Sequence, residues 1–191
     1  MKKIILVAAL SVICTASFAQ KFAHVNSQEL FQLMPEMDAA RAQMDGVVKE
    51  NEDVMKTMYD ELQTKYQQYQ QKASTWTAAV KEVKEKELQD LQNRIQESQQ
   101  TMQQEMQSIQ AQLTAPVMKK CQEAIEAAAK AGGYIYVFDV ASALYIDPAQ
   151  STDLTPQLRK TLNIPEGRTL ETLQKELEAK QAADAAADAQ K

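Results

Sequence analysis

The chain of 191 residues contains few of the residues that build catalytic and metal-binding centres. It has a single histidine, His24, and no closely spaced pair of cysteines, so the common metal-ligand patterns are missing. No glycine-rich phosphate loop and no serine nucleophile motif is present. His24 lies on a candidate strand, where a structural role is the better interpretation. We therefore expect no catalysis, no metal and no cofactor.

The first nineteen residues have the pattern of a secretory signal peptide. Lys2 and Lys3 give a positive start, an apolar core of about ten residues follows, and a small-x-small cleavage site ends at Ala19. A membrane anchor is the alternative, but about ten apolar residues are too few to span a bilayer. The sequence therefore predicts export, with a mature chain that begins at Gln20.

Charge and cysteine content narrow the partners of the mature chain. Without Lys2 and Lys3, 19 basic and 26 acidic residues remain, which gives a formal charge near −7 and makes nucleic acid an unexpected partner. Cys14 would leave with the signal, so Cys121 is alone and forms no intrachain disulfide. We expect Cys121 to pack as a small apolar residue, with a reactive or intermolecular role as the alternative.

The longest regular pattern covers residues 36–131 and predicts an antiparallel α-helical hairpin. Apolar residues recur at helical spacing in both halves, at Met37, Met44, Val48, Met55, Met58 and Leu62 and again at Leu88, Leu91, Ile95, Met102, Met106, Ile109 and Leu113. Ser and Thr cluster in residues 72–80, which places the reversal there. Each arm has about 40 residues, or roughly 60 Å of helix, so the hairpin must project from a base.

The flanking residues predict a small β body with short helices. Residues 21–25 form a candidate strand, and the capping-box pair Asn26 and Glu29 starts a short helix. Gly132 and Gly133 end the second arm. Two β-rich stretches follow, residues 134–140 and 143–146, and the first is apolar enough to be buried on both faces. Thr155 as cap and Pro156 begin a last helix that runs to about Leu162.

The predicted body is too small to form a stable core as a monomer. About 50 residues are near the lower limit for an independent core, and the sheet edges have no covering element in the sequence. Both problems disappear if several copies join their strands into one closed barrel, so we predict an obligate oligomer. From Gly167 onward the composition becomes Ala-rich and acidic, and beyond Glu178 we expect a frayed or disordered tail.

The order of several blocks resembles the Skp/OmpH family of periplasmic chaperones over the mature chain to about Ile164. The blocks are VNSQELF, KEVKEKELQDLQ, LTAPVMKKCQEAI, GGYIYVFDVASALYIDP and DLTPQL. The resemblance implies a homotrimer in which three helical tentacles leave a small β-barrel body and enclose a cavity. That cavity would hold unfolded outer-membrane β-barrel proteins in the periplasm without ATP.

Pattern and resemblance together give one architecture: an α+β, mainly α chain whose long antiparallel hairpin projects from a β body that closes into a barrel in a trimer. The predicted regions are the signal peptide (1–19), the body (20–35 and 113–166), the tentacle (36–112) and the tail (167–191). By position, the resemblance assigns oligomerisation to body-strand residues Phe22, Val25, Tyr136, Phe138, Val140, Leu144 and Ile146.

Methionine and tyrosine on the first arm are candidates for binding unfolded clients. Methionine adapts to many apolar shapes, and tyrosine has an apolar face with a polar edge. The candidate residues are Met55, Met58, Leu62, Tyr66, Tyr69 and Trp76. The alternative for Met55, Met58 and Leu62 is the seam between the two helices, which is the usual role of such a stripe.

Two further alternatives remain open. Family members with basic tentacles are thought to attract acidic clients or lipopolysaccharide, but here the arms mix signs, so membrane or lipopolysaccharide contact is doubtful. A structural coiled-coil spacer of the cell envelope is the second alternative. A spacer would keep an unbroken apolar seam through many heptads. This hairpin turns Gln-rich and aromatic toward its tip, which favours the holdase.

Overall fold

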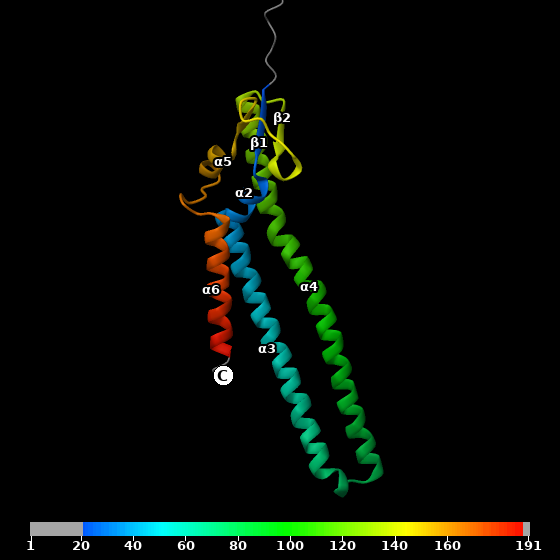
Figure 1. Ribbon diagram of the computed structural model, residues 1–191. Helices are drawn as coiled ribbons and strands as arrows, with labels where there is room; N and C mark the ends of the chain where they lie inside the picture. The colour runs from blue at the N-terminus through cyan, green and yellow to red at the C-terminus, as the bar shows by residue number, and fades with distance from the viewer. Residues whose placement is uncertain (1–20, 189–191) are drawn as a thin grey trace, which may run out of the picture. The chain divides into compact units, whose positions relative to one another are not determined.

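The computed structural model describes residues 21–188 (Figure 1). The predicted signal peptide, residues 1–19, lies outside the described residues. The described chain divides into two compact units, one formed by the residues up to Gln32 together with those from Lys120 onward, and one formed by Leu33–Lys119. We call them the body and the hairpin and describe each by itself. Among the described residues, no helix has the length and apolarity that crossing a membrane requires.

The hairpin consists of two long helices joined by a short reversal. Helix α3 (Pro35–Lys72) leads into the 3₁₀ turn η1 (Ala73–Thr75), and α4 (Ala78–Gly132) returns antiparallel to it (Figure 1). Pro35 begins α3, where its missing N–H costs no hydrogen bond. Thr77 caps α4 by accepting from the N–H of Val80 at 3.4 Å. The predicted hairpin and its reversal are therefore confirmed.

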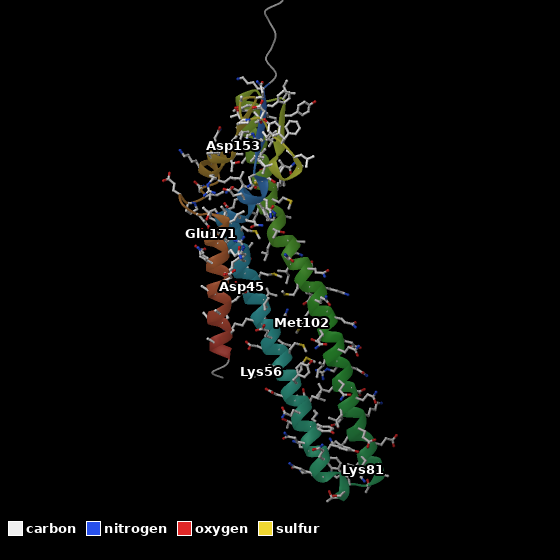
Figure 2. All side chains as sticks on the ribbon, viewed as in Figure 1. Asp45, Lys56, Lys81, Met102, Asp153 and Glu171 are labelled. Carbon is white, nitrogen blue, oxygen red and sulfur yellow. The ribbon has the colours of Figure 1, made fainter. Side chains whose placement is uncertain are left out.

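Only a few side chains are buried along the hairpin. Within the arms these are Ala40, Leu91, Ile95 and Val117, and Leu33 and Met34 are buried where the unit begins. The other members of the apolar stripes, including Met55, Met58, Leu62, Met102 and Met106, are only half-buried. Figure 2 shows the side chains of the two arms extending into the space between them. The hairpin therefore has a seam that is apolar but incompletely sealed.

The body contains a three-stranded parallel sheet in the order β2-β1-β3. Strand β1 (Phe22–Val25) is central, β2 (Tyr136–Asp139) and β3 (Ser151–Asp153) are its neighbours, and Phe22 is aligned with both Tyr136 and Ser151. Successive side chains of a strand point to opposite faces. Ala23 and Val25 are accordingly buried on one face, while Phe22 and His24 lie on the other.

Two predictions about the strands are wrong. The predicted strand at residues 143–146 is not part of the sheet, and the third strand is instead the polar segment β3. Strand β2 stops at Asp139 because its carboxylate accepts from the N–H of Ala141 at 2.8 Å, which bends Val140 into the 3₁₀ turn η2 (Val140–Ser142). Within the chain β2 is also not buried on both faces, since Tyr136 and Phe138 are exposed.

Short helices complete the body. The predicted capping box of α2 (Ser27–Leu33) is formed only in part. The side chain of Asn26 accepts from the N–H of Glu29 at 3.0 Å, but Glu29 accepts from the Asn26 side-chain amide and not from its backbone N–H. At the start of α5 (Thr155–Thr161) the prediction is wrong in detail, because Asp153 accepts from the N–H of Thr155. The Thr155 hydroxyl instead accepts from the N–H of Asn26 at 3.0 Å and so joins the two ends of the body.

The body core consists of aliphatic side chains from α2, α5 and the segments around them. Its most buried members are Ala23, Val25, Leu30, Leu154, Leu158, Leu162 and Ile164. Gly133 ends α4 with a φ of 67°, and the N–H of Tyr134 donates to the carbonyl of Ala129 at 3.0 Å, which is the predicted C-cap.

The C-terminal segment differs from the prediction of a frayed or disordered tail. Residues Leu170–Asp188 form the helix α6. Its sequence is rich in Ala, Glu, Lys and Leu, which have high helix propensity. Among the side chains described for α6, only Leu173 is buried. The acidic, Ala-rich composition therefore encodes an exposed helix.

Candidate functional site

The apolar candidates on α3 fall into two groups. Met55, Met58 and Leu62 are half-buried at spacings of three and four residues, as expected for the seam interpretation, yet none is sealed from solvent. Tyr66 lies outside this stripe and is 53% exposed. The hairpin thus presents a partly open stripe of flexible apolar side chains with an exposed tyrosine beside it.

Tyr69 and Trp76 form an aromatic cluster at the reversal. Their ring centroids lie 5.9 Å apart with an interplanar angle of 65°, an edge-to-face arrangement. The Tyr69 hydroxyl donates to the Glu85 carboxylate on α4, and this hydrogen bond raises the pKa of Tyr69 above its ordinary value. The cluster therefore joins the end of α3, the turn and the start of α4.

Other exposed apolar residues of the hairpin are missing from the sequence prediction. Tyr59 is 47% exposed, and its hydroxyl accepts from the Gln99 amide at 2.8 Å across the two arms. Tyr59 and Tyr66 are seven residues apart, which places them on the same side of α3. Val54, Val80 and Val83 are exposed as well. Val54 and Tyr59 lie one position away from the half-buried Met55 and Met58 of α3, and this helical phase is the signal that could have identified them. Val80 and Val83 belong to α4.

Ion pairs near the reversal combine charges of both signs. Lys84 donates to both Glu87 carboxylate oxygens at 2.9 Å, and Lys65 lies 3.8 Å from the same carboxylate. The hydrogen bond from Lys84 holds the pKa of Glu87 below its usual value. Lys65 also lies 3.6 Å from Glu61. The mixed charges of the arms thus form ion pairs here.

An aromatic surface covers the exposed face of the body sheet. The ring centroids of Phe22 and Tyr136 are 6.4 Å apart with nearly parallel planes, and Phe138 lies 6.4 Å from Phe22 and 6.0 Å from Tyr136. Tyr136 and Phe138 remain 60% and 48% exposed. We call Phe22, Tyr136 and Phe138 the aromatic face. Leu144 and Tyr145, in the irregular segment after β2, are exposed too.

The remaining oligomerisation candidates lie elsewhere. Val25 is only 3% exposed, because strand alternation directs it into the core of its own chain. Val140 lies in η2, and Val140 and Ile146 are half-buried. The structure therefore brings together three of the seven candidates, Phe22, Tyr136 and Phe138, as one surface.

His24 and Cys121 have structural surroundings. The Nδ1 atom of His24 lies 2.9 Å from the Ser151 hydroxyl on β3. Across residues 21–188, no group of three or more His, Cys, Asp and Glu side chains is arranged to hold a metal ion. Cys121 is buried, and burial raises the pKa of its thiol. A buried, protonated thiol fits the predicted role as a small apolar residue.

Comparisons with known proteins agree on one family. The family described as "Outer membrane protein (OmpH-like)" matches residues 21–162. The crystal structure of a candidate outer membrane chaperone (OmpH-like) from Caulobacter crescentus CB15 is similar with a TM-score of 0.66 at 16% identity, over 75% of this chain and 84% of that chain. At this identity the likeness concerns the fold. No curated protein matches the chain.

Proposed function

We propose that this chain, which belongs to the OmpH-like family of outer membrane proteins, is an ATP-independent periplasmic holdase chaperone. The family is a chaperone family, so the chain is not an enzyme. Its clients would be unfolded outer-membrane β-barrel proteins, held so that they cannot aggregate. The signal-peptide pattern of residues 1–19 supports a periplasmic location.

The observation that carries this proposal is the incompletely sealed apolar seam of the hairpin. An unfolded barrel strand exposes alternating apolar side chains that must be shielded, yet the client must also be able to leave. Half-buried methionines adapt to many apolar shapes and have little tight packing to lose. Tyr59 and Tyr66 add exposed rings on one side of α3. Such a surface suits broad and reversible binding better than one defined ligand.

The aromatic face supports an oligomer. Exposed rings on a short sheet, beside the unpaired edges of β2 and β3, make a surface that a single chain leaves open to water. Joining the strands of three copies into a closed barrel would cover both rings and edges and would direct the hairpins around a common cavity. We propose this homotrimer, with Phe22, Tyr136 and Phe138 at its centre.

A client-holding assay tests the proposal directly. A urea-unfolded outer-membrane β-barrel protein is diluted into buffer without nucleotide, and its light scattering is followed with and without the chaperone at a few trimer equivalents. We expect suppressed scattering and a stoichiometric complex on a sizing column. Unchanged aggregation in the presence of a folded oligomer would overturn the holdase and favour the envelope spacer.

Matched variants locate the client surface. Replacing Tyr59 and Tyr66 together by serine removes two exposed rings from one side of α3, so more chaperone should be needed to suppress scattering. Replacing Gln63 and Gln70 by serine changes two exposed positions with the same spacing and should leave the assay unchanged. Equal effects of the two double variants would contradict a role for the tyrosines.

A further inference from the structure

A pocket lies between the two arms of the hairpin near the reversal. It has a volume of about 250 Å³, and its lining includes Lys65 and Lys72 of α3, Trp76 of the turn, and Lys84, Glu87 and Leu88 of α4. Pockets for drug-sized ligands begin at roughly 300 Å³. Its volume would accommodate one large side chain with its adjoining backbone.

The charges in the lining do not balance. Three lysines line the pocket with one carboxylate, and Glu87 is already held by Lys84 at 2.9 Å and approached by Lys65 at 3.8 Å. Lys65 has Glu61 as a second partner at 3.6 Å, and Glu85 accepts from Tyr69. Among the described residues, the Lys72 ammonium has no carboxylate within ion-pair distance. Lys72 is thus the cation that remains available to a ligand.

An apolar wall stands beside this cation. Trp76 is half-buried with Tyr69 packed against the edge or face of its ring, and Leu88 is half-buried on the other arm. A large apolar side chain on Trp76 and Leu88 would leave water while an attached anion reached Lys72. Lys72 is exposed, so water partly screens its attraction for an anion, and the apolar contact with Trp76 and Leu88 would add to that attraction.

We propose that this pocket binds a carboxylate joined to a large apolar side chain of an unfolded client. The proposal rests on the proposed function, since an unfolded polypeptide is the expected ligand and its anionic groups are carboxylates. The carboxylate has two sources, a chain end with a C-terminal aromatic residue or an internal Asp or Glu beside an aromatic residue. Binding at this site gives the hairpin a charged anchor in addition to its adaptable apolar seam.

The test uses the fluorescence of Trp76, because it is the only tryptophan in the chain. The full-length protein is titrated with an acetylated Gly-Ser peptide ending in Phe with a free carboxylate, and with the same peptide ending in an amide. A third, amidated peptide carries an internal Asp-Phe pair, and inorganic phosphate is the fourth probe. We expect a saturable change with a carboxylate peptide and at least tenfold weaker binding of the amidated Phe peptide.

Lys72→Gln should weaken binding of the carboxylate peptide at least tenfold, whereas Lys56→Gln, at an exposed lysine of α3 outside the lining, should not change it (Figure 2). Circular dichroism checks that both variants keep their helices. Whichever carboxylate peptide binds identifies the source. Binding of the amidated Phe peptide as tight as that of both carboxylate peptides, no fluorescence change with any peptide, or saturation by phosphate at the same concentrations would overturn the proposal.

The aggregation assay separates this proposal from the holdase. If the wild-type protein binds the carboxylate peptide but leaves client aggregation unchanged, the holdase fails and the pocket stands. If client aggregation is suppressed while Trp76 reports no peptide, the pocket fails and the holdase stands.

Discussion

The body and the hairpin are stabilised by different interactions. The body buries a compact set of aliphatic side chains, and polar bonds join segments far apart in sequence, such as Asn26 with Thr155 and Glu29 with Arg159. The hairpin buries few residues along two long arms and links them by isolated long side chains, such as Tyr59 with Gln99. The body thus depends on close packing, and the hairpin on helix formation with a loose seam.

This difference in packing indicates which part of the chain can change its contacts at low cost. A closely packed core loses several kcal/mol when it changes shape, whereas half-exposed methionines can repack at little cost. The proposed function would use this property, because the hairpin would exchange contacts between its own arms for contacts with an unfolded client. The following substitutions test the contrast, beginning with the largest expected effect.

Shortening a core leucine should affect the body far more than the hairpin. Leu158 is fully buried in α5, so Leu158→Ala should lower the free energy of unfolding by about 2–5 kcal/mol. Leu62 is only half-buried, and Leu62→Ala should cost about 1 kcal/mol. Urea unfolding followed by circular dichroism at one fixed protein concentration measures both. Equal losses would mean that the seam is as tightly packed as the core.

Removing an ion pair should also lower stability more in the body than in the hairpin. Arg159 donates to Glu29 at 2.5 Å and to the carbonyl of Arg168, with a side chain only 19% exposed. Arg159→Met should cost about 1–3 kcal/mol, because it leaves partly buried acceptors unpaired. The hairpin control is Lys65→Met, which removes exposed ion pairs that water screens, so its loss should be clearly smaller. Thermal unfolding of the two variants compares them, and a larger loss for the control would reverse the contrast.

Two glycines should respond to alanine with opposite signs. Gly133 ends α4 with a φ of 67°, where a side chain is strained, so Gly133→Ala should cost about 1–2 kcal/mol. Gly46 lies inside α3, with open space where the methyl group of an alanine would lie, so Gly46→Ala should stabilise the hairpin by about 0.5–1 kcal/mol. Urea unfolding gives both signs, and destabilisation at Gly46 would indicate a required flexible point in α3.

The smallest predicted effect concerns the alkaline titration of Tyr69. Its hydrogen bond to Glu85 raises the pKa, so this contribution is present at neutral pH and is lost as the pH rises through the folded-state value. Glu85→Gln should bring the pKa of Tyr69 back toward its ordinary value. Ring-labelled NMR resolves this tyrosine, and the other tyrosines are the internal control. An unchanged Tyr69 titration would mean that the link between the arms does not persist in solution.

The parts of the structure that could be predicted from the sequence are those determined by local patterns. The hairpin follows from apolar spacing repeated over dozens of residues, and the Asn26 cap depends on a partner three positions away. The third strand could not be found in this way, because Ser151–Asp153 is polar and becomes a strand only by pairing with β1. The apolar segment that includes Leu144 matches strand propensity but has no partner strand within the described chain.

The candidate sites also divide into those that the sequence could predict and those that depend on contacts distant in sequence. The sequence identified Tyr66 and Trp76 by type, and Phe22, Tyr136 and Phe138 by position in the resembling family. The prediction missed Tyr59 because it followed only the seam stripe, although the seven-residue spacing between Tyr59 and Tyr66 is visible in the sequence. The pocket at Lys72 could not be predicted from the sequence. Its lining comes from α3 and α4, and these side chains are close only after the chain has reversed.

The central position of β1 has a consequence for the order in which this protein folds. Strand β1 comes first among the described elements, yet both of its partners follow the hairpin, and Phe22 pairs with Tyr136 and Ser151. Helices form from local contacts within about a microsecond, whereas non-local strand pairing is slow. The arms should therefore form before the sheet that completes the body. During that interval the chain is itself incompletely folded with exposed β segments, which is the condition of the clients that the proposed function gives it.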